Sequence, residues 1–475
     1  MIKRSVALMH FQFENLGLLD QVDLELANLT LICGENNTGK TYATYAVYGF
    51  LRSWRQILRV VIEDEIDTLL KDSDQYRIDL GAMFDGKIDD YLKRMGKIYV
   101  GGLPRAFATQ AEIFEKTVFI PSACLETDIS SKAFQRTVKA GTGGKVLATL
   151  TKESDSVMLE VLVADEEVIM RPFGGLTDFI VDAIAEIVFA QHLPRVHISS
   201  AERTGAAIFR KELDMARTRM LKAINQIDSK ELRRNPFKIL QEIETDYAWP
   251  VEDNVDFVRQ LEDIDKRTGE LAAHNPELLV AFDTIIGGSY KVVKQELVYQ
   301  AKGAGKQRFT MNEASSCIRA LLDVGFYLRC RARSGDIFII DEPELNLHPK
   351  NQRAFARLVA RMVNAGIKVF ITTHSDYLVK ELNTLIMLHQ RTEHTRSVQQ
   401  QYKYADEELL DPAVVRLYMT ATIAKPSTGA GRRGKVRTLK LANIYPDRGI
   451  EVETFDDTIE VMNAIQGEIL YGGDL

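Results

Sequence analysis

An eight-residue stretch near the N-terminus constrains the fold more than any other part of the chain. Residues 34–41 have the sequence Gly-Glu-Asn-Asn-Thr-Gly-Lys-Thr, which matches the phosphate-binding pattern G-x-x-x-x-G-K-[ST]. An apolar segment at 29–33 precedes this stretch, and residues 42–48 follow it with helical spacing. Strand, loop and helix therefore occur in the order that a P-loop requires. The alternative is a glycine-rich turn with an incidental lysine.

The residue types in this stretch predict a site for ATP and Mg²⁺. The residues that we expect to bind the nucleotide here are Gly34, Asn36, Asn37, Thr38, Gly39, Lys40 and Thr41. The two glycines allow the main chain to fold around the phosphates with its N–H groups pointing inward. Lys40 would reach the β- and γ-phosphates, and the hydroxyl of Thr41 would bind Mg²⁺, which takes few protein ligands.

The composition bears on which other classes of protein the chain could belong to. It has 475 residues, of which 45% are hydrophobic, so a folded chain of two or three domains is expected. The net charge of −7 does not indicate a nucleic-acid-binding protein, although a local basic groove would be compatible with it. No apolar run reaches the roughly 20 residues that cross a bilayer. The four cysteines lack metal-ligand spacing, and we expect a cytoplasmic protein with reduced thiols.

A second apolar strand, far along the chain, ends in two acids. Residues 336–342 have the sequence Asp-Ile-Phe-Ile-Ile-Asp-Glu, which is a Walker B pattern. At the carboxyl end of a parallel strand, Asp341 would order the Mg²⁺ shell and Glu342 would orient or deprotonate the attacking water. The alternative role for the two carboxylates is to cap the following helix.

A third apolar strand, at 368–373, leads directly to His374. The intervening segment begins with Pro349 and has helical periodicity, so the third strand should lie beside the Walker B strand. That position favours His374 as a sensor of the γ-phosphate over a purely structural histidine.

The remaining segments give weaker signals. Alternating residues at 5–8 and 22–26 predict strands of a small antiparallel β lobe, and 290–299 also alternates as one strand. Residues 195–200 predict a strand that runs into a loop with Glu202 and Arg203, for which we expect an exposed position and, as the alternative, a role in a site. Residues 206–279 are helical and charged. Near the C-terminus, 450–455 alternates as an exposed strand, and 432–437 is a basic cluster that predicts a solvated loop or a phosphate-binding patch.

A polar segment at 312–317 leads into an apolar helix about 25 residues before the Walker B motif. Serine and asparagine at this position can simply cap the helix. With this segment placed, the chain resembles the ABC-type ATPase heads of the SMC-like and OLD-nuclease-like class, whose extended Walker B is similar to Asp-Glu-Pro-Glu-Leu-Asn-Leu-His-Pro at 341–349. The resemblance covers roughly 1–60 and 280–395. It implies that Ser315 and Ser316 are signature residues, which contact the ATP of a second subunit.

The resemblance also implies roles for the residues described above. It makes Lys40 and Thr41 ligands of phosphate and metal, Asp341 a metal ligand, Glu342 the catalytic base and His374 the switch histidine. Two features depart from the class pattern. Cys317 stands where a glycine is usual, and no convincing Q-loop glutamine is found.

The expected fold is α/β, an ABC-type P-loop ATPase head with an antiparallel β lobe and a helical insertion. The expected parts are an N-terminal part of the head with P-loop and β lobe at 1–205, a helical insertion at 206–279, a C-terminal part of the head at 280–395 and a partner-binding tail at 396–475. The tail is short for a TOPRIM nuclease and has no separated Glu and Asp-x-Asp pair, so a nuclease is expected on a separate chain.

Within the class, the compact size and the loop sequence are most similar to ATPase subunits of anti-phage systems, first PARIS and then Septu. This implies a homo-oligomer, at least a head-to-head dimer, that works as an ATP-dependent switch. Its partners would be a separate effector, of TOPRIM type or another nuclease, and a phage trigger protein. The alternatives are an SMC-like ATPase of DNA repair, which would favour a long coiled coil and a basic surface, and a transporter ATPase.

Overall fold

The computed structural model describes residues 9–71, 76–123, 128–139, 144–164, 175–210, 247–294, 296–424, 435–451 and 465–466. By its internal contacts the chain divides into two units. The first comprises residues 1–27, 46–104 and 109–196, and the second 28–45, 105–108 and 197–475. These limits differ from the boundaries at 205, 279 and 395 expected from the sequence, which remain predictions.

The first unit contains two antiparallel sheets. One has the strand order β2-β1-β5 and the other β4-β8-β7-β6. The antiparallel β lobe predicted ahead of the P-loop is thus present, although its predicted segment at 5–8 lies outside the described residues. The strands are β1 (Met9–Leu16), β2 (Leu19–Leu26), β4 (Arg77–Asp79), β5 (Val118–Ala123), β6 (Phe134–Lys139), β7 (Val146–Lys152) and β8 (Met158–Val163).

Aromatic side chains fill the centre of the first unit. Phe119 of β5 lies 5.7 Å from Phe11, 5.5 Å from Phe50 and 5.0 Å from Tyr99, between ring centroids. All four rings are almost completely buried. The helices of this unit are α2 (Leu80–Phe84), α3 (Ile88–Val100), α5 (Leu176–Ile184) and the π-helical turn η3 (Ala185–Phe189), and α1 (Lys40–Lys71) and α4 (Leu103–Ala106) have residues in both units.

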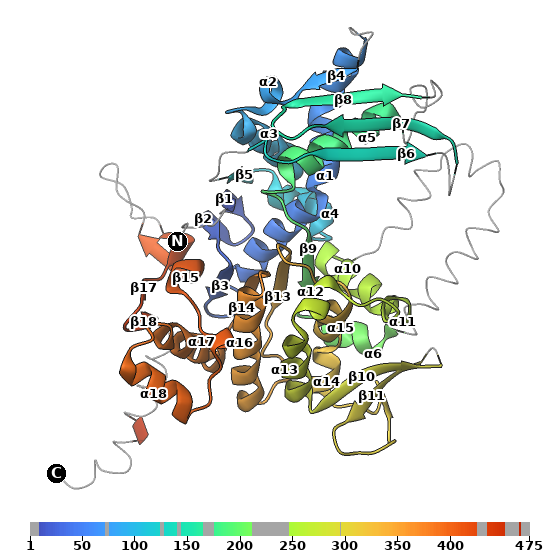
Figure 1. Cartoon of the computed structure of the whole chain (residues 1–475). Coiled ribbons are helices and arrows are strands. Elements are labelled where there is room, and N and C mark those ends of the chain that lie inside the picture. Colours follow the sequence, from blue (N-terminus) through green and yellow to red (C-terminus); the bar gives the residue numbers. More distant parts are fainter. Residues whose placement is uncertain are drawn as a thin grey trace, which may run out of the picture. The chain divides into compact units, whose positions relative to one another are not determined.

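The second unit is built on a six-stranded sheet with the order β16-β15-β3-β14-β13-β9 (Figure 1). Strands β15, β3, β14 and β13 are mutually parallel, and β16 is antiparallel to β15. The strands are β3 (Leu29–Cys33), β9 (Val196–Ser199), β13 (Ile337–Asp341), β14 (Lys368–Thr373), β15 (Val415–Ala424) and β16 (Lys435–Leu441). The strand predictions at 29–33, 336–342 and 368–373 are confirmed.

Helices with apolar faces cover the central strands, because strands buried on both faces need cover. Helices α16 and α17 pack together, and Phe355, Val359 and Leu382 share a core with Phe338 of β13 and Ile371 of β14. The helices of this unit are α6 (Arg203–Ile208), α10 (Trp249–Arg259), α11 (Leu261–Ile264), α12 (Glu270–His274), α13 (Pro276–Ile286), α14 (Ser316–Ala320), α15 (Leu322–Cys330), α16 (Pro349–Asn364), α17 (Asp376–Leu388) and α18 (Glu393–Gln401).

One sequence-based prediction differs from the structure of this unit. The single strand predicted at 290–299 is two strands, β10 (Gly288–Val293) and β11 (Glu296–Ala301), which pair antiparallel and are joined to β12 (Phe309–Thr310). Lys294 takes a positive φ of 51° at the turn, where a glycine or asparagine would have signalled the hairpin. The range expected as a partner-binding tail contains β15 and β16, and these two strands belong to the central sheet.

Several other predictions fall wholly or partly outside the described residues. The basic cluster at 432–437 is described only from Lys435, and the strand at 450–455 only to Glu451, where β18 (Gly449–Ile450) pairs with β17 (Ile444–Tyr445). Of the helical region 206–279, residues 206–210 and 247–279 are described. The first range contains the end of α6, and the second forms α10, α11, α12 and the start of α13. Within the described residues, no helix is long and apolar enough to cross a membrane.

Candidate functional site

The P-loop connects β3 to α1 and has the backbone conformation that its glycines allow. Gly34 and Gly39 have φ values of 145° and 100°, and Asn37 lies in the left-handed region at 61°. The hydroxyl of Thr38 donates to the carbonyl of Glu35 at 2.7 Å, which closes the turn. The loop therefore has the curvature that points main-chain N–H groups inward.

Lys40 begins α1 and is 5% exposed. Its Nζ donates to the carbonyl oxygens of Gly34 at 3.0 Å and Glu35 at 2.6 Å, across the opening of the loop. Burial lowers the pKa of Lys40, while the carboxylates of Glu342 and Asp341 act in the opposite direction. The structure thus brings the P-loop lysine into the field of the two Walker B carboxylates.

The register of three parallel strands explains this convergence. Thr373 at the end of β14 pairs with Cys33, the last residue of β3, and Asp341 at the end of β13 pairs with Thr372. The carboxyl ends of the three strands therefore align at one edge of the sheet, which is where α/β proteins bind ligands. His374 was predicted to follow a strand beside the Walker B strand, and this is confirmed.

Asp341 is 2% exposed and accepts a short hydrogen bond from the hydroxyl of Thr372. Burial raises the pKa of Asp341 to about 6, the bond from Thr372 opposes the rise, and the charges of Glu342 and Glu202 add to it. A cation at this position would remove the cost of burying the carboxylate, because it favours the charged form.

Glu342 and His374 form a direct pair. The Nε2 atom of His374 lies 3.1 Å from Oε1 of Glu342, and since a carboxylate can only accept, this contact requires the proton on Nε2. Glu342 has a positive φ of 49°, a conformation that costs a non-glycine residue about 1–3 kcal/mol. Its N–H is held by the carbonyl of Thr372 at 3.1 Å.

Glu344 fixes the strand end from which His374 extends. Its Oε1 accepts from the backbone N–H of His374 at 2.6 Å, and its Oε2 accepts from the hydroxyl of Thr373 at 2.9 Å. Burial raises the pKa of Glu344, and these two bonds oppose the rise. Glu344 belongs to the extended Walker B segment, but no sequence pattern assigned it this positioning role.

Arg203 was predicted to lie in an exposed loop, and this is wrong. It is the first residue of α6, is 1% exposed, and donates to the carbonyl oxygens of Asp341 and Glu342, each at 2.7 Å. The segment 201–205 has no apolar run that would have signalled burial. The one available signal was its position after a strand, which is where site residues of α/β folds collect.

The predicted signature residues lie at the start of α14. Ser315 is the N-cap residue of α14 and Ser316 its first residue, and both are exposed. The side chain of Ser315 makes no capping hydrogen bond, so capping alone does not account for the serines. Their exposure leaves the hydroxyl groups accessible to a second molecule.

Strand β15 forms the other neighbour of the P-loop strand. Met419 pairs with Cys33, so that Thr420 follows at the start of the loop. A Cβ atom at Gly34 would lie 1.9 Å from Oγ1 of Thr420. Gly34 is therefore required both by its φ and by the closeness of β15, and the sequence indicated only the first reason.

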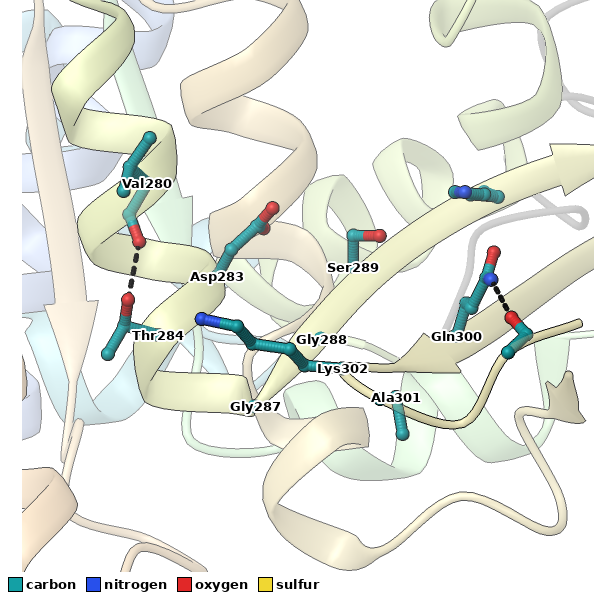
Figure 2. Close-up of a pocket in the computed structure, with 12 residues that line it drawn as sticks. Val280, Asp283, Thr284, Gly287, Gly288, Ser289, Gln300, Ala301 and Lys302 are labelled. Atoms are coloured by element: carbon teal, nitrogen blue, oxygen red, sulfur yellow. Dashed lines mark hydrogen bonds between the residues drawn. The ribbon is translucent and has the colours of Figure 1, made fainter. Parts of the chain in front are cut away.

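A separate pocket of about 700 Å³ lies between α13 and the β10–β11 hairpin (Figure 2). Asp283, Ser289, Gln300 and Lys302 contribute polar groups to it. None of the predicted site residues lines it, so this pocket is distinct from the P-loop site.

The residues present at the sheet edge fit ATP and Mg²⁺. The exposed hydroxyl of Thr41 and the buried carboxylate of Asp341 are oxygen donors, and Mg²⁺ takes one or two protein ligands together with phosphate oxygens and water. Within the described residues, no group of three or more His, Cys, Asp and Glu side chains could hold a metal ion by itself. The donor set therefore suits a metal that arrives with a phosphate.

Comparison with known families agrees with this geometry. Residues 183–379 match the model of a family described as an AAA ATPase domain. Residues 183–379 are thus similar to an ATPase domain. The matched range contains Arg203, Asp341, Glu342 and His374, and the P-loop precedes it. The α/β P-loop ATPase fold expected from the sequence is confirmed, and comparison with curated proteins finds no match.

Solved structures of SMC heads are similar to the chain. The SMC head domain from Thermotoga maritima is 10% identical with a TM-score of 0.32, and the alignment covers 92% of this chain and 99% of that one. An SMC head bound to the C-terminal winged-helix domain of ScpA is 12% identical, with a TM-score of 0.33 and coverage of 91% and 97%. An SMC head domain with an extended coiled coil, bound to the C-terminal domain of ScpA derived from Pyrococcus furiosus, is 13% identical with a TM-score of 0.30. The alignment covers 97% of this chain and 99% of that one.

The raised pKa of Asp341 predicts a pH-dependent stability. The carboxyl has a pKa of about 6 in the folded chain against an ordinary value of 3.8, so its stabilising contribution is complete below about pH 4 and is lost as the pH rises through 6. Asp341→Asn removes the ionisation. Without nucleotide or metal, the variant should gain about 2 kcal/mol relative to the wild type between pH 4.5 and pH 8, measured by urea unfolding.

The control is Asp90→Asn, at an exposed position of α3. It should change the free energy of unfolding by less than about 0.5 kcal/mol at either pH. An equal difference between Asp341→Asn and wild type at both pH values would contradict the proposed burial of this carboxylate.

Proposed function

We propose that this chain binds ATP with Mg²⁺ and hydrolyses it. The observation that carries the proposal is the convergence of Lys40, Asp341, Glu342 and His374 at the aligned ends of three parallel strands. Each of these side chains has the chemistry that one part of phosphoryl transfer needs. The family match to an ATPase domain over 183–379 supports the same conclusion.

Binding would begin with an exchange of partners at Lys40. Its Nζ would leave the carbonyl oxygens of Gly34 and Glu35 and bind the β- and γ-phosphates, because charge-assisted bonds to phosphate are stronger than bonds to neutral carbonyls. Thr41 and Asp341 would hold Mg²⁺, which neutralises phosphate charge when bound.

Hydrolysis would depend on the pair of Glu342 and His374. Glu342 would orient the attacking water and accept its proton, while the Nε2 proton of His374, which faces Glu342 at 3.1 Å, would turn toward the γ-phosphate. Such a shift between two partners gives the site different contacts before and after hydrolysis.

The exposed serines of α14 support a reaction between two subunits. Ser315 and Ser316 are free to contact the ATP held by a second copy of the chain, as the resemblance to ABC-type heads implies. We therefore propose a homo-oligomer, at least a head-to-head dimer, in which each active site takes residues from both copies.

The proposed biological role is a switch in anti-phage defence, similar to the ATPase subunits of PARIS and Septu systems. The nucleotide bound to this chain would control a separate effector, a nuclease of TOPRIM or another type, in response to a phage-derived trigger.

The position of the C-terminal segment supports such a switch. Strand β15 touches the P-loop at Thr420, and β16 is the outer strand of the sheet beyond it. An effector strand added to β16 would be separated from β3, which leads into the P-loop, by the two strands β16 and β15.

Two substitutions separate nucleotide binding from hydrolysis. Glu342→Gln should keep ATP affinity within about threefold and lower kcat at least about 100-fold, because an amide can hold water but cannot accept its proton. Lys40→Ala should instead lose most of its ATP affinity, because the phosphates lose their cationic partner. Titration with a fluorescent ATP analogue and a phosphate-release assay measure the two effects. The exposed Glu393→Gln in α18 serves as the control. Equal ATP affinity in wild type and Lys40→Ala would refute the P-loop assignment.

A mixing experiment tests catalysis between subunits. Lys40→Ala and Ser316→Arg should each be inactive alone, because one lacks the phosphate ligand and the other obstructs the signature surface. A mixture in which subunits exchange should regain up to about half of the activity per mixed dimer, since one of its two sites escapes both lesions. Exchange is verified by a fluorescence label. Proven exchange without any recovery of ATPase activity would show that α14 does not act in trans.

The switch role is tested in cells and by purification. The chain should protect bacteria from phage only together with its gene neighbour, and the two proteins should co-purify. Glu342→Gln should change the amount of neighbour retained, because it holds the ATP state. Full protection by this chain alone would overturn the switch model and indicate a self-contained effector.

A further inference from the structure

Arg203 makes an unusual set of contacts for a buried charged side chain. Its Nε donates to the carbonyl of Ala320 at 2.9 Å, its Nη1 to those of Ser200 at 2.9 Å and Asp341 at 2.7 Å, and its Nη2 to that of Glu342 at 2.7 Å. All four acceptors are main-chain oxygens. They come from the residue that follows β9, the last residue of α14, the last residue of β13 and the residue that follows β13.

These contacts require an arginine. The guanidinium is planar and has five N–H donors in a fixed fork, so it can bind several carbonyl groups in different directions at once. A lysine in the same place has three donors on one atom and cannot span the same separations. Burial lowers the pKa of Arg203, and the charges of Asp323 and Asp341 oppose this shift, so the surrounding carboxylates help to keep the group charged.

The location of the acceptors distinguishes Arg203 from an ordinary core residue. Asp341 and Glu342 are the residues whose side chains serve the metal and the water in the proposed reaction. The carbonyl of Glu342 belongs to a residue with a positive φ of 49°, and the orientation of that main chain sets the direction of the carboxylate toward His374.

The carbonyl of Ala320, which accepts from Nε of Arg203, belongs to a different part of the second unit. Ala320 is the last residue of α14, the five-residue helix that begins at Ser316. Helix α6, which carries Arg203, packs directly against α14. A displacement of α14 when its exposed serines meet another molecule would therefore be felt first at the bond between Ala320 and Arg203.

We propose that Arg203 is a positioning residue that couples the signature helix α14 to the catalytic carboxylate Glu342 of the same chain. This inference rests on the proposed ATPase and deepens it. Engagement of α14 by the ATP of a second subunit would shift the carbonyl of Ala320, and the rigid guanidinium would transmit the shift to the main chain of Asp341 and Glu342. The site would thus hydrolyse its own ATP faster when the other site is also filled.

The test is a double-mutant cycle on kcat. Arg203→Lys keeps the charge but loses the fork, and Ser316→Ala weakens the contact of α14 with the second subunit. Each alone should lower kcat at least about tenfold with ATP affinity changed less than about threefold. Because both act on one linkage, the double variant should be little slower than the slower single variant, rather than showing the product of the two losses.

The matched control is Arg94→Lys. Arg94 of α3 also donates to a main-chain carbonyl, that of Val61 at 2.7 Å, and its other hydrogen-bond partner, Glu65 at 2.9 Å, likewise belongs to the first unit. This substitution should leave kcat unchanged. If it lowers kcat slightly, the double variant with Ser316→Ala should show the product of the two single fold-losses in kcat. Multiplicative effects of Arg203→Lys and Ser316→Ala would overturn the coupling, as would a normal kcat in Arg203→Lys.

Two further measurements distinguish an effect of a substitution on folding from an effect on catalysis. Thermal unfolding and ATP titration are carried out on every variant, and Arg203→Gln replaces Arg203→Lys if the lysine variant does not fold. Failure of both to fold would show that Arg203 serves the fold alone and would overturn the proposal. An inactive wild type would refute the proposed ATPase itself, whereas an active wild type with independent effects refutes only the coupling.

Discussion

The parallel pairing of β3, β14 and β13 is the constraint on which the site depends. Cys33 pairs with Thr373, and Thr372 pairs with Asp341, so three segments that are distant in sequence end at the same level. A shift of one residue in either pairing would turn the side chains of a whole strand to the opposite face. The buried apolar residues of these strands therefore fix the geometry of the P-loop, the Walker B carboxylates and His374 together.

A second layer of polar side chains holds the main chain at this edge. Glu344 binds the N–H of His374, Arg203 binds the carbonyls of Asp341 and Glu342, and Thr372 binds both the side chain of Asp341 and, through its carbonyl, the N–H of Glu342. Burying such charged groups is costly unless their hydrogen bonds are satisfied. This arrangement lowers the stability of the fold somewhat, but it fixes the direction of the groups that would contact ATP.

A feature could be predicted from the sequence where one contiguous stretch of residues carries its pattern. The P-loop, the Walker B strand and the strand before His374 could be predicted, because each is a contiguous apolar run with a polar end. The burial of Arg203 and the contact of Thr420 with Gly34 could not, since both arise from segments more than 100 residues apart. The β10–β11 hairpin was missed because its turn contains Lys294 in a positive-φ conformation without a glycine.

The most direct test of the account is a crystal structure of Glu342→Gln bound to ATP and Mg²⁺. We expect the phosphates inside the 34–41 loop, Nζ of Lys40 on phosphate oxygens instead of the carbonyls of Gly34 and Glu35, and His374 within hydrogen-bond distance of the γ-phosphate. ATP bound elsewhere, such as in the pocket between α13 and the β10–β11 hairpin, or a Lys40 that stays on the two carbonyls, would contradict it.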